Sequence, residues 1–250
     1  MHDDTHIGGS LDRFPVTRHS IVAELGHADA SVRGHAMGAV IQTYWKPVYT
    51  YLRLKHRLDN ETAKDLTQGF FTHVLEKRTL DAFDPSRARF RTWVRTCLDA
   101  WAANQHQSDQ RQKRGGGAQH LSLDFATADG ELQERHLAVD ADVELFFERE
   151  WARHLFSLAI ADVHADCVRR GRDVDFAIFQ RYDLEGPDAA RPLRYADLAA
   201  EFGIPVTRVT NTLHAVRGRV RTALLERLRA ICVSQEEFLA EAQDFFGGRP

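Results

Sequence analysis

The sequence predicts an all-α protein. Apolar residues recur at helical spacing in three long stretches, Glu61–Lys77, Phe90–Trp101 and Phe147–Val168. No stretch alternates apolar and polar residues as a half-buried β-strand would. The chain has 250 residues, 43% of them hydrophobic, which is enough for one or two helical cores.

The first predicted domain, residues 17–117, follows a flexible N-terminus of residues 1–16. Its helices are expected over Thr17–Gly26, His35–Leu54, Glu61–Lys77 and from Phe90 beyond Trp101. Pro47 should kink or restart the second helix, because proline lacks the amide N–H of the helical ladder. Asp59 and Asn60 are suited to cap the start of the third helix. The three glycines at 115–117 are expected to end the fourth helix in a joint.

The second predicted domain, residues 147–233, follows an acidic linker over residues 118–146. Its helices are expected over Phe147–Val168, Phe176–Tyr182, Tyr195–Glu201 and Pro205–Arg229. Residues 234–250 are expected to form an amphipathic C-terminal tail. The predicted architecture is therefore two helical domains joined by an acidic segment.

Charge is distributed unevenly along the chain, although the net charge is only −3. Residues 87–114 carry seven basic and two acidic side chains, and residues 204–229 carry six and one. Between them, residues 124–150 carry nine acidic and two basic side chains. Two basic helical segments favour a protein that contacts nucleic acid at two places.

Other classes of function find little support. Cys97, Cys167 and Cys232 are far apart, which favours reduced thiols in the cytoplasm over disulfides or a zinc site. The 13 histidines show no metal-ligand spacing, and neither a phosphate-binding glycine loop nor a nucleophile–base set is evident. No apolar run approaches the roughly 20 residues that span a bilayer. We expect a cytoplasmic protein that is not an enzyme, needs no cofactor or metal, and does not insert into a membrane.

The stretch Tyr195–Arg229 has the pattern of a helix–turn–helix. Gly203 supplies the turn, and Ile204, Val209 and Leu213 supply the buried face. The opposite face of the second helix then carries side chains that can reach base edges and phosphates in a major groove. These are Thr207, Arg208, Thr210, Asn211, His214 and Arg217. The alternative is an ordinary basic surface helix.

With its motifs in this order, the chain resembles a bacterial extracytoplasmic-function RNA polymerase sigma factor. The stretch YWKPVYTYLRLKHRLDNETAKDLTQGFFTHVLEK resembles the first half of region 2 of that family, and FRTWVRTCLDAWAANQHQSDQRQKR resembles the second half. The stretch YADLAAEFGIPVTRVTNTLHAVRGRVRTALLERL resembles the region-4 helix–turn–helix. The resemblance covers most of residues 17–230. It implies a protein that binds core RNA polymerase and directs transcription initiation at selected promoters.

The resemblance also implies where the partners bind. Core polymerase contacts are expected on Asp65, Leu66, Gln68 and Phe71. Contacts with the promoter −10 element are expected on Asn104, Gln105, Arg111, Lys113 and Arg114. Trp93 and Trp101 are either stacking residues or core residues. The second helix of the helix–turn–helix would read the −35 element, and the acidic linker would run near the polymerase active-site channel.

The helix expected to dock on polymerase departs from the family pattern. Its usual acidic cluster is replaced by Thr62-Ala63-Lys64-Asp65, in which only Asp65 keeps its charge. A phosphate on Thr62 would add about −1.5 to −2 charges where the first acid belongs, near a helix N-terminus that favours anions. We therefore expect a Ser/Thr protein kinase to phosphorylate Thr62 and switch on polymerase binding, as in a sigma subgroup that this chain resembles. Thr67 is the second candidate, and constitutive binding is the alternative.

Two other functions stay open on the sequence. A stand-alone helix–turn–helix regulator that never contacts polymerase would not need the polar strip formed by Asp65, Gln68, Thr72 and Glu76. A protein–protein adaptor, such as an anti-sigma partner, would not need the basic recognition helix.

Overall fold

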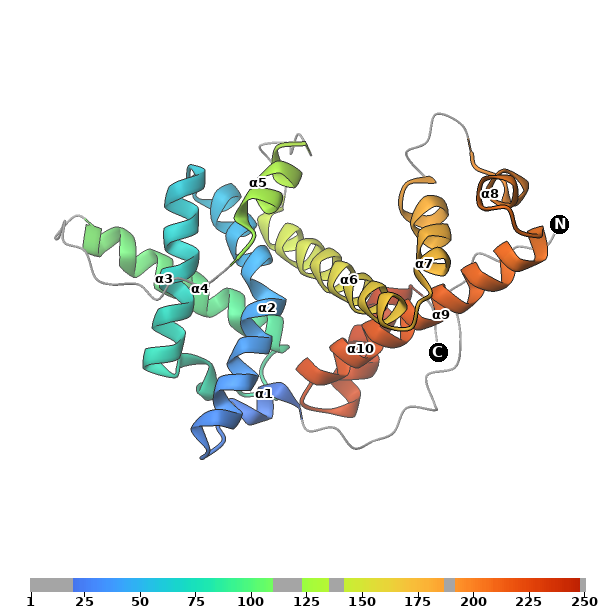
Figure 1. Cartoon of the computed structure of the whole chain (residues 1–250). Helices are drawn as coiled ribbons and strands as arrows, with labels where there is room; N and C mark the ends of the chain where they lie inside the picture. The colour runs from blue at the N-terminus through green and yellow to red at the C-terminus, as the bar shows by residue number, and fades with distance from the viewer. Residues whose placement is uncertain (1–19, 110–122, 135–141, 187–191, 248–250) are drawn as a thin grey trace. The chain divides into compact units, whose positions relative to one another are not determined.

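The computed structural model describes residues 20–109, 123–134, 142–186 and 192–247, which form helices and turns with no β-strand among them (Figure 1). The all-α class is thereby confirmed. These residues divide into two units. The N-terminal unit, as we call it, comprises residues 20–154 and 229–240, and the helix–turn–helix unit comprises residues 155–228 and 241–247. The division falls within helix α6 (Val143–Arg169), after His154.

The N-terminal unit is built on α2 (Ala30–Lys55), α3 (Asn60–Lys77) and α4 (Phe90–Asp109), with the short α1 (Ile21–Glu24) before them. Helix α3 packs along α2, while α4 and the 3₁₀ turn η1 (Thr79–Ala82) lie against α3 (Figure 1). The four helices predicted from the sequence are thus present, and α4 extends beyond the predicted apolar stretch.

Helix α2 runs through Pro47 as one continuous element. The predicted restart does not occur. The Thr50 hydroxyl donates to the carbonyl oxygens of Lys46 and Pro47 at 2.9 and 3.2 Å, inside the same turn. Both sides of this turn are buried against the unit's core, where Tyr44 packs on Phe90 with ring centroids 5.7 Å apart. Tertiary packing therefore holds a helix that proline alone would interrupt.

The segment predicted to be an acidic linker contains a helix, α5 (Phe125–Glu134), which packs on α2. Phe125 and Ala128 are buried in a cluster with Tyr49. Asp129 accepts hydrogen bonds from the hydroxyl of Tyr49 at 2.9 Å and from the guanidinium of Arg53. Residues 123–134 therefore belong to the N-terminal unit, and the remainder of the predicted linker before residue 142 lies outside the described residues.

The helix–turn–helix unit contains α7 (Asp173–Phe179), a π-helical turn (Gln180–Leu184), α8 (Tyr195–Phe202) and most of α9 (Val206–Ile231). Its core joins residues of α6, α7, α8 and α9. The buried members are Val163, Cys167, Phe176, Ile178, Phe179, Leu198, Val209, Leu213, Val216 and Val220. The predicted tail is a helix, α10 (Gln235–Phe246).

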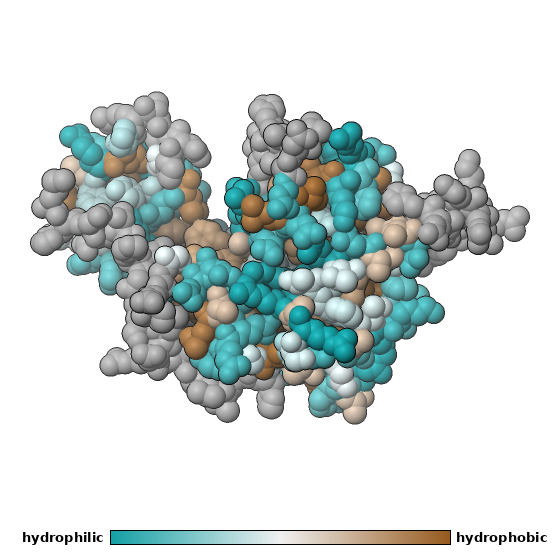
Figure 2. Space-filling model, turned by 180° about the vertical axis from the view of Figure 1, so that it is seen from behind, coloured by the Kyte–Doolittle hydropathy of each residue, from teal (hydrophilic) through white to brown (hydrophobic). Residues whose placement is uncertain are grey.

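The side of the molecule seen in Figure 2 is largely hydrophilic, with hydrophobic residues confined to small areas. Among the residues described, no helix combines the length and apolar character needed to cross a membrane.

Candidate nucleic-acid and polymerase interface

The predicted helix–turn–helix is formed by α8, a tight turn and α9. Gly203 ends α8 with φ +65°, and its amide N–H donates to the carbonyl of Ala199. The amide of Ile204 donates to the same carbonyl at 3.0 Å. Leu198 and Val209 are fully buried where α8 meets α9. The left-handed glycine and the apolar positions predicted from the sequence therefore make the turn as expected.

One face at the start of α9 is polar and accessible. Thr207, Asn211 and His214 are exposed. The side chain of Arg208 is 63% exposed and lies 3.5 Å from Asp175, which makes a loose surface ion pair. These four side chains can reach a ligand without a rearrangement of the helix, because surface pairs of this kind contribute little energy.

Two of the six residues predicted for this face are engaged within the protein. Arg217 makes a bidentate ion pair with Asp183, with nitrogen–oxygen distances of 2.8 to 3.2 Å, and its side chain is 19% exposed. The hydrogen bonds to Asp183 raise the pKa of this guanidinium further above its ordinary value. The hydroxyl of Thr210 donates to the carbonyl of Thr207 at 2.9 Å. Arg217 thus anchors α9 to the π-helical turn after α7.

The predicted −10 contacts lie at the C-terminal end of α4. Asn104 is exposed and Gln105 is half-buried. Arg111, Lys113 and Arg114 lie outside the described residues. Trp101 is 6% exposed and meets the ring of Phe70 edge-on, with centroids 5.9 Å apart, so it is almost fully buried.

Acidic residues of α6 neutralise part of the first basic segment. Arg95 pairs with Glu144 at 2.7 Å, and Arg91 lies 3.8 Å from Glu148. The two arginine side chains are only 14% and 9% exposed. The hydrogen bond from Arg95 lowers the pKa of Glu144. These two arginines therefore hold α4 against α6 and are not available as free cations.

The residues predicted to dock on polymerase differ in accessibility. Asp65 is exposed and Leu66 is half-buried on α3. Gln68 is 9% exposed, and Phe71 is completely buried in the core. The helical period places Phe71 on the buried side of α3, together with Ala63, Phe70 and Val74. An interface on α3 would therefore involve its outer face around Asp65 and not Phe71.

Thr62 occupies an exposed position in the first turn of α3. Its hydroxyl donates to Oδ2 of Asp59 at 2.8 Å, and its amide N–H donates to Oδ1 at 2.9 Å. These bonds, the backbone one most strongly, lower the pKa of Asp59. Thr67, the second candidate for phosphorylation, is fully buried, and its hydroxyl donates to the carbonyl of Ala63 at 2.7 Å. A kinase could reach Thr62 in the folded protein but not Thr67.

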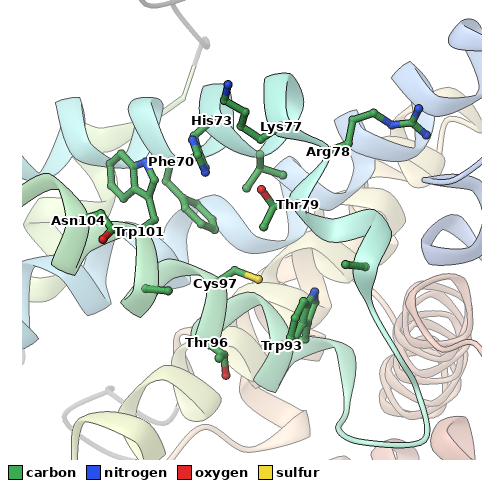
Figure 3. A pocket seen from close by; sticks show the side chains of 13 residues that line it. Phe70, His73, Lys77, Arg78, Thr79, Trp93, Thr96, Cys97, Trp101 and Asn104 are labelled. Atoms are coloured by element: carbon green, nitrogen blue, oxygen red, sulfur yellow. The ribbon is translucent and has the colours of Figure 1, made fainter.

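A pocket between α3, η1 and α4 was not predicted. Its cavity measures about 480 Å³, and it brings together residues from Phe70 to Asn104 in the sequence (Figure 3). No local sequence pattern predicts this pocket, because its lining residues come from three separate elements. Among the described residues, no group of three or more His, Cys, Asp or Glu side chains is placed to hold a metal ion.

Comparisons with known proteins found no match for this chain among protein-family models, curated proteins or solved structures.

Proposed function

We propose that this protein is an alternative sigma factor that binds core RNA polymerase and directs promoter-specific initiation. The observation that carries the proposal is the polar face of α9, where Thr207, Arg208, Asn211 and His214 follow the glycine turn of a helix–turn–helix. Side chains of these types at the start of a recognition helix suit the major groove. The order of the other motifs in the sequence supplies the rest of the argument.

We further propose that phosphorylation of Thr62 controls polymerase docking. The hydroxyl is exposed, and it bonds to Asp59 as a donor. A phosphate ester removes that donor and places a dianion beside the Asp59 carboxylate, so the first turn of α3 must rearrange. Lys64, whose ammonium lies 2.7 Å from Glu61, is within the same turn and can accept the new anion as a partner. The modification would thus change both the charge and the local geometry of the outer face.

A second candidate is a stand-alone DNA-binding regulator without polymerase contact. The burial of Phe71 and Gln68 favours it, because two of the four residues expected to dock on polymerase offer little surface. Asp65 and Leu66 leave only a small patch for that partner.

Run-off transcription with purified core polymerase separates the two candidates. The parent protein is compared with Thr62→Ala and Thr62→Glu, each with and without a Ser/Thr kinase and ATP. A kinase-dependent transcript with the parent and none with Thr62→Ala is the expected result. Specific DNA binding without any transcript, whatever the phosphorylation state, would favour the stand-alone regulator. Equal polymerase pull-down by all forms in the presence of kinase would refute the Thr62 switch alone.

A further inference from the structure

The pocket between α3, η1 and α4 has an apolar floor. Phe70, Cys97 and Trp101 supply it from the two long helices (Figure 3). Val74 of α3 and Ala82 of η1 also line the pocket. A volume of about 480 Å³ lies in the range of roughly 300–1,000 Å³ that is typical of small-molecule sites. An apolar floor of this size suits a flat ring system.

Polar side chains border this floor. Asn104, exposed at the end of α4, lies beside Phe70 and Trp101 (Figure 3). An asparagine amide can donate and accept at once, which matches the edge of an adenine ring. His73 and Lys77 stand together on α3 at the rim of the pocket (Figure 3). The lining residues include no carboxylate, so an anion at this rim is not repelled by a negative charge of the pocket.

The other cationic side chain that lines the pocket, Arg78, is paired with Asp81. Arg78 donates through Nε to Asp81 at 2.6 Å, and its backbone takes the left-handed conformation that ends α3. Lys77 is exposed, and within the described part of the chain no acidic side chain forms an ion pair with it. Lys77 is therefore the cation best placed to bind an incoming anion.

We propose that this pocket binds a free purine mononucleotide, with adenosine monophosphate the simplest member of the class. The base lies on the apolar floor with its edge toward Asn104, and the phosphate lies at His73 and Lys77. The site differs from the polar face of α9 and from Thr62 and shares only Asn104 with the predicted −10 contacts, so it would give the protein a ligand beyond the proposed function. Binding requires neither polymerase nor promoter DNA.

Isothermal titration calorimetry of the full chain tests the site with AMP, adenosine and inorganic phosphate as separate probes. AMP should bind at one site per chain and more tightly than either fragment. Lys77→Gln should weaken AMP binding by roughly tenfold, the size of one charge-assisted hydrogen bond, while leaving adenosine binding unchanged. Lys64→Gln is the matched control, because it removes the same charge from α3 outside the pocket. Circular dichroism confirms that both variants are folded.

Absence of AMP binding by the parent would overturn the proposal, as would equal weakening by Lys64→Gln. A single-stranded oligodeoxyadenylate without terminal phosphates is titrated as well. Binding of this oligonucleotide without binding of AMP would also overturn the proposal, because the pocket would then serve a DNA strand and not a free nucleotide. None of these outcomes depends on whether the protein supports transcription.

Discussion

Replacement of Arg217 by glutamine should destabilise the protein without weakening any contact that α9 makes with DNA phosphates. Three nitrogen–oxygen contacts of 2.8 to 3.2 Å join Arg217 to Asp183, and the two side chains are 19% and 23% exposed. Hydrogen bonds to charged groups contribute about 1.5–3 kcal/mol, and the partial exposure of this pair places it toward the lower end. We expect the free energy of unfolding to fall by about 2 kcal/mol, because Asp183 loses its partner.

Arg208→Gln is the matched control, since it removes the same charge from the same helix. Its side chain is 63% exposed and pairs only loosely with Asp175, so stability should change little. If α9 enters a groove, Arg208→Gln should weaken duplex binding and lower the slope of log K against log salt by about 1. Urea unfolding measures the stability change, and fluorescence anisotropy with a labelled duplex at several salt concentrations measures the slope. A loss of slope for Arg217→Gln equal to that for Arg208→Gln would refute the assignment of Arg217 as an anchor.

Three further expectations follow from local features. Gly203→Ala should lower the free energy of unfolding in urea by about 1–2 kcal/mol, because the φ of +65° at this position strains any L side chain, while an added Cβ would meet no clash. A loss of stability no larger than the one caused by Gly218→Ala would contradict this reason. The pKa of Asp59 is lowered, chiefly by the amide of Thr62, so its stabilising contribution is present above its ordinary pKa of about 3.9 and is lost as the pH falls through the lower folded value; Asp59→Asn should therefore lose stability at pH 6 but little at pH 2, and an equal loss at both would contradict it. Burial raises the pKa of Cys232 to about 12, so a thiol reagent at pH 8 should label Cys232 only after unfolding, and its rapid labelling in the native protein would show that it is accessible.

The parts of the fold that depend on short-range signals could be predicted from the sequence. Asp59 caps α3 and Gly203 ends α8 because both effects act within one turn of a helix. Helix α5 was missed because its composition is acidic and it contains Gly130, and its burial depends on the distant residue Tyr49. Local propensity is weak there, and packing on α2 decides the conformation.

Two of the predicted site residues are less accessible than residue type or motif alone suggests. Residue type suggests that an arginine on a basic helix faces solvent. Arg217 instead pairs with Asp183, which lies in a π-helical turn that could not be predicted from the sequence. Likewise, a motif places Phe71 near a partner, while the helical position places it in the core. The direction of Arg217 is fixed by Asp183, which lies far away in the sequence, whereas the direction of Phe71 follows from the helical period of α3.

The uneven charge distribution has a partly internal explanation. Acidic residues between the two basic segments neutralise basic residues of the N-terminal unit, as the pairs of Arg95 with Glu144 and of Lys46 with Glu131 demonstrate. Since the side chains of Arg95 and Lys46 are 14% and 9% exposed, these charges are engaged inside the unit and are poorly placed to attract DNA. Any contact of α4 with nucleic acid would therefore depend on its C-terminal end from Asn104 onward, whereas α9 presents its exposed polar face directly. In the second basic segment Arg217 and Arg227 likewise pair with Asp183 and Asp162, so part of the positive charge in both segments is neutralised by internal ion pairs.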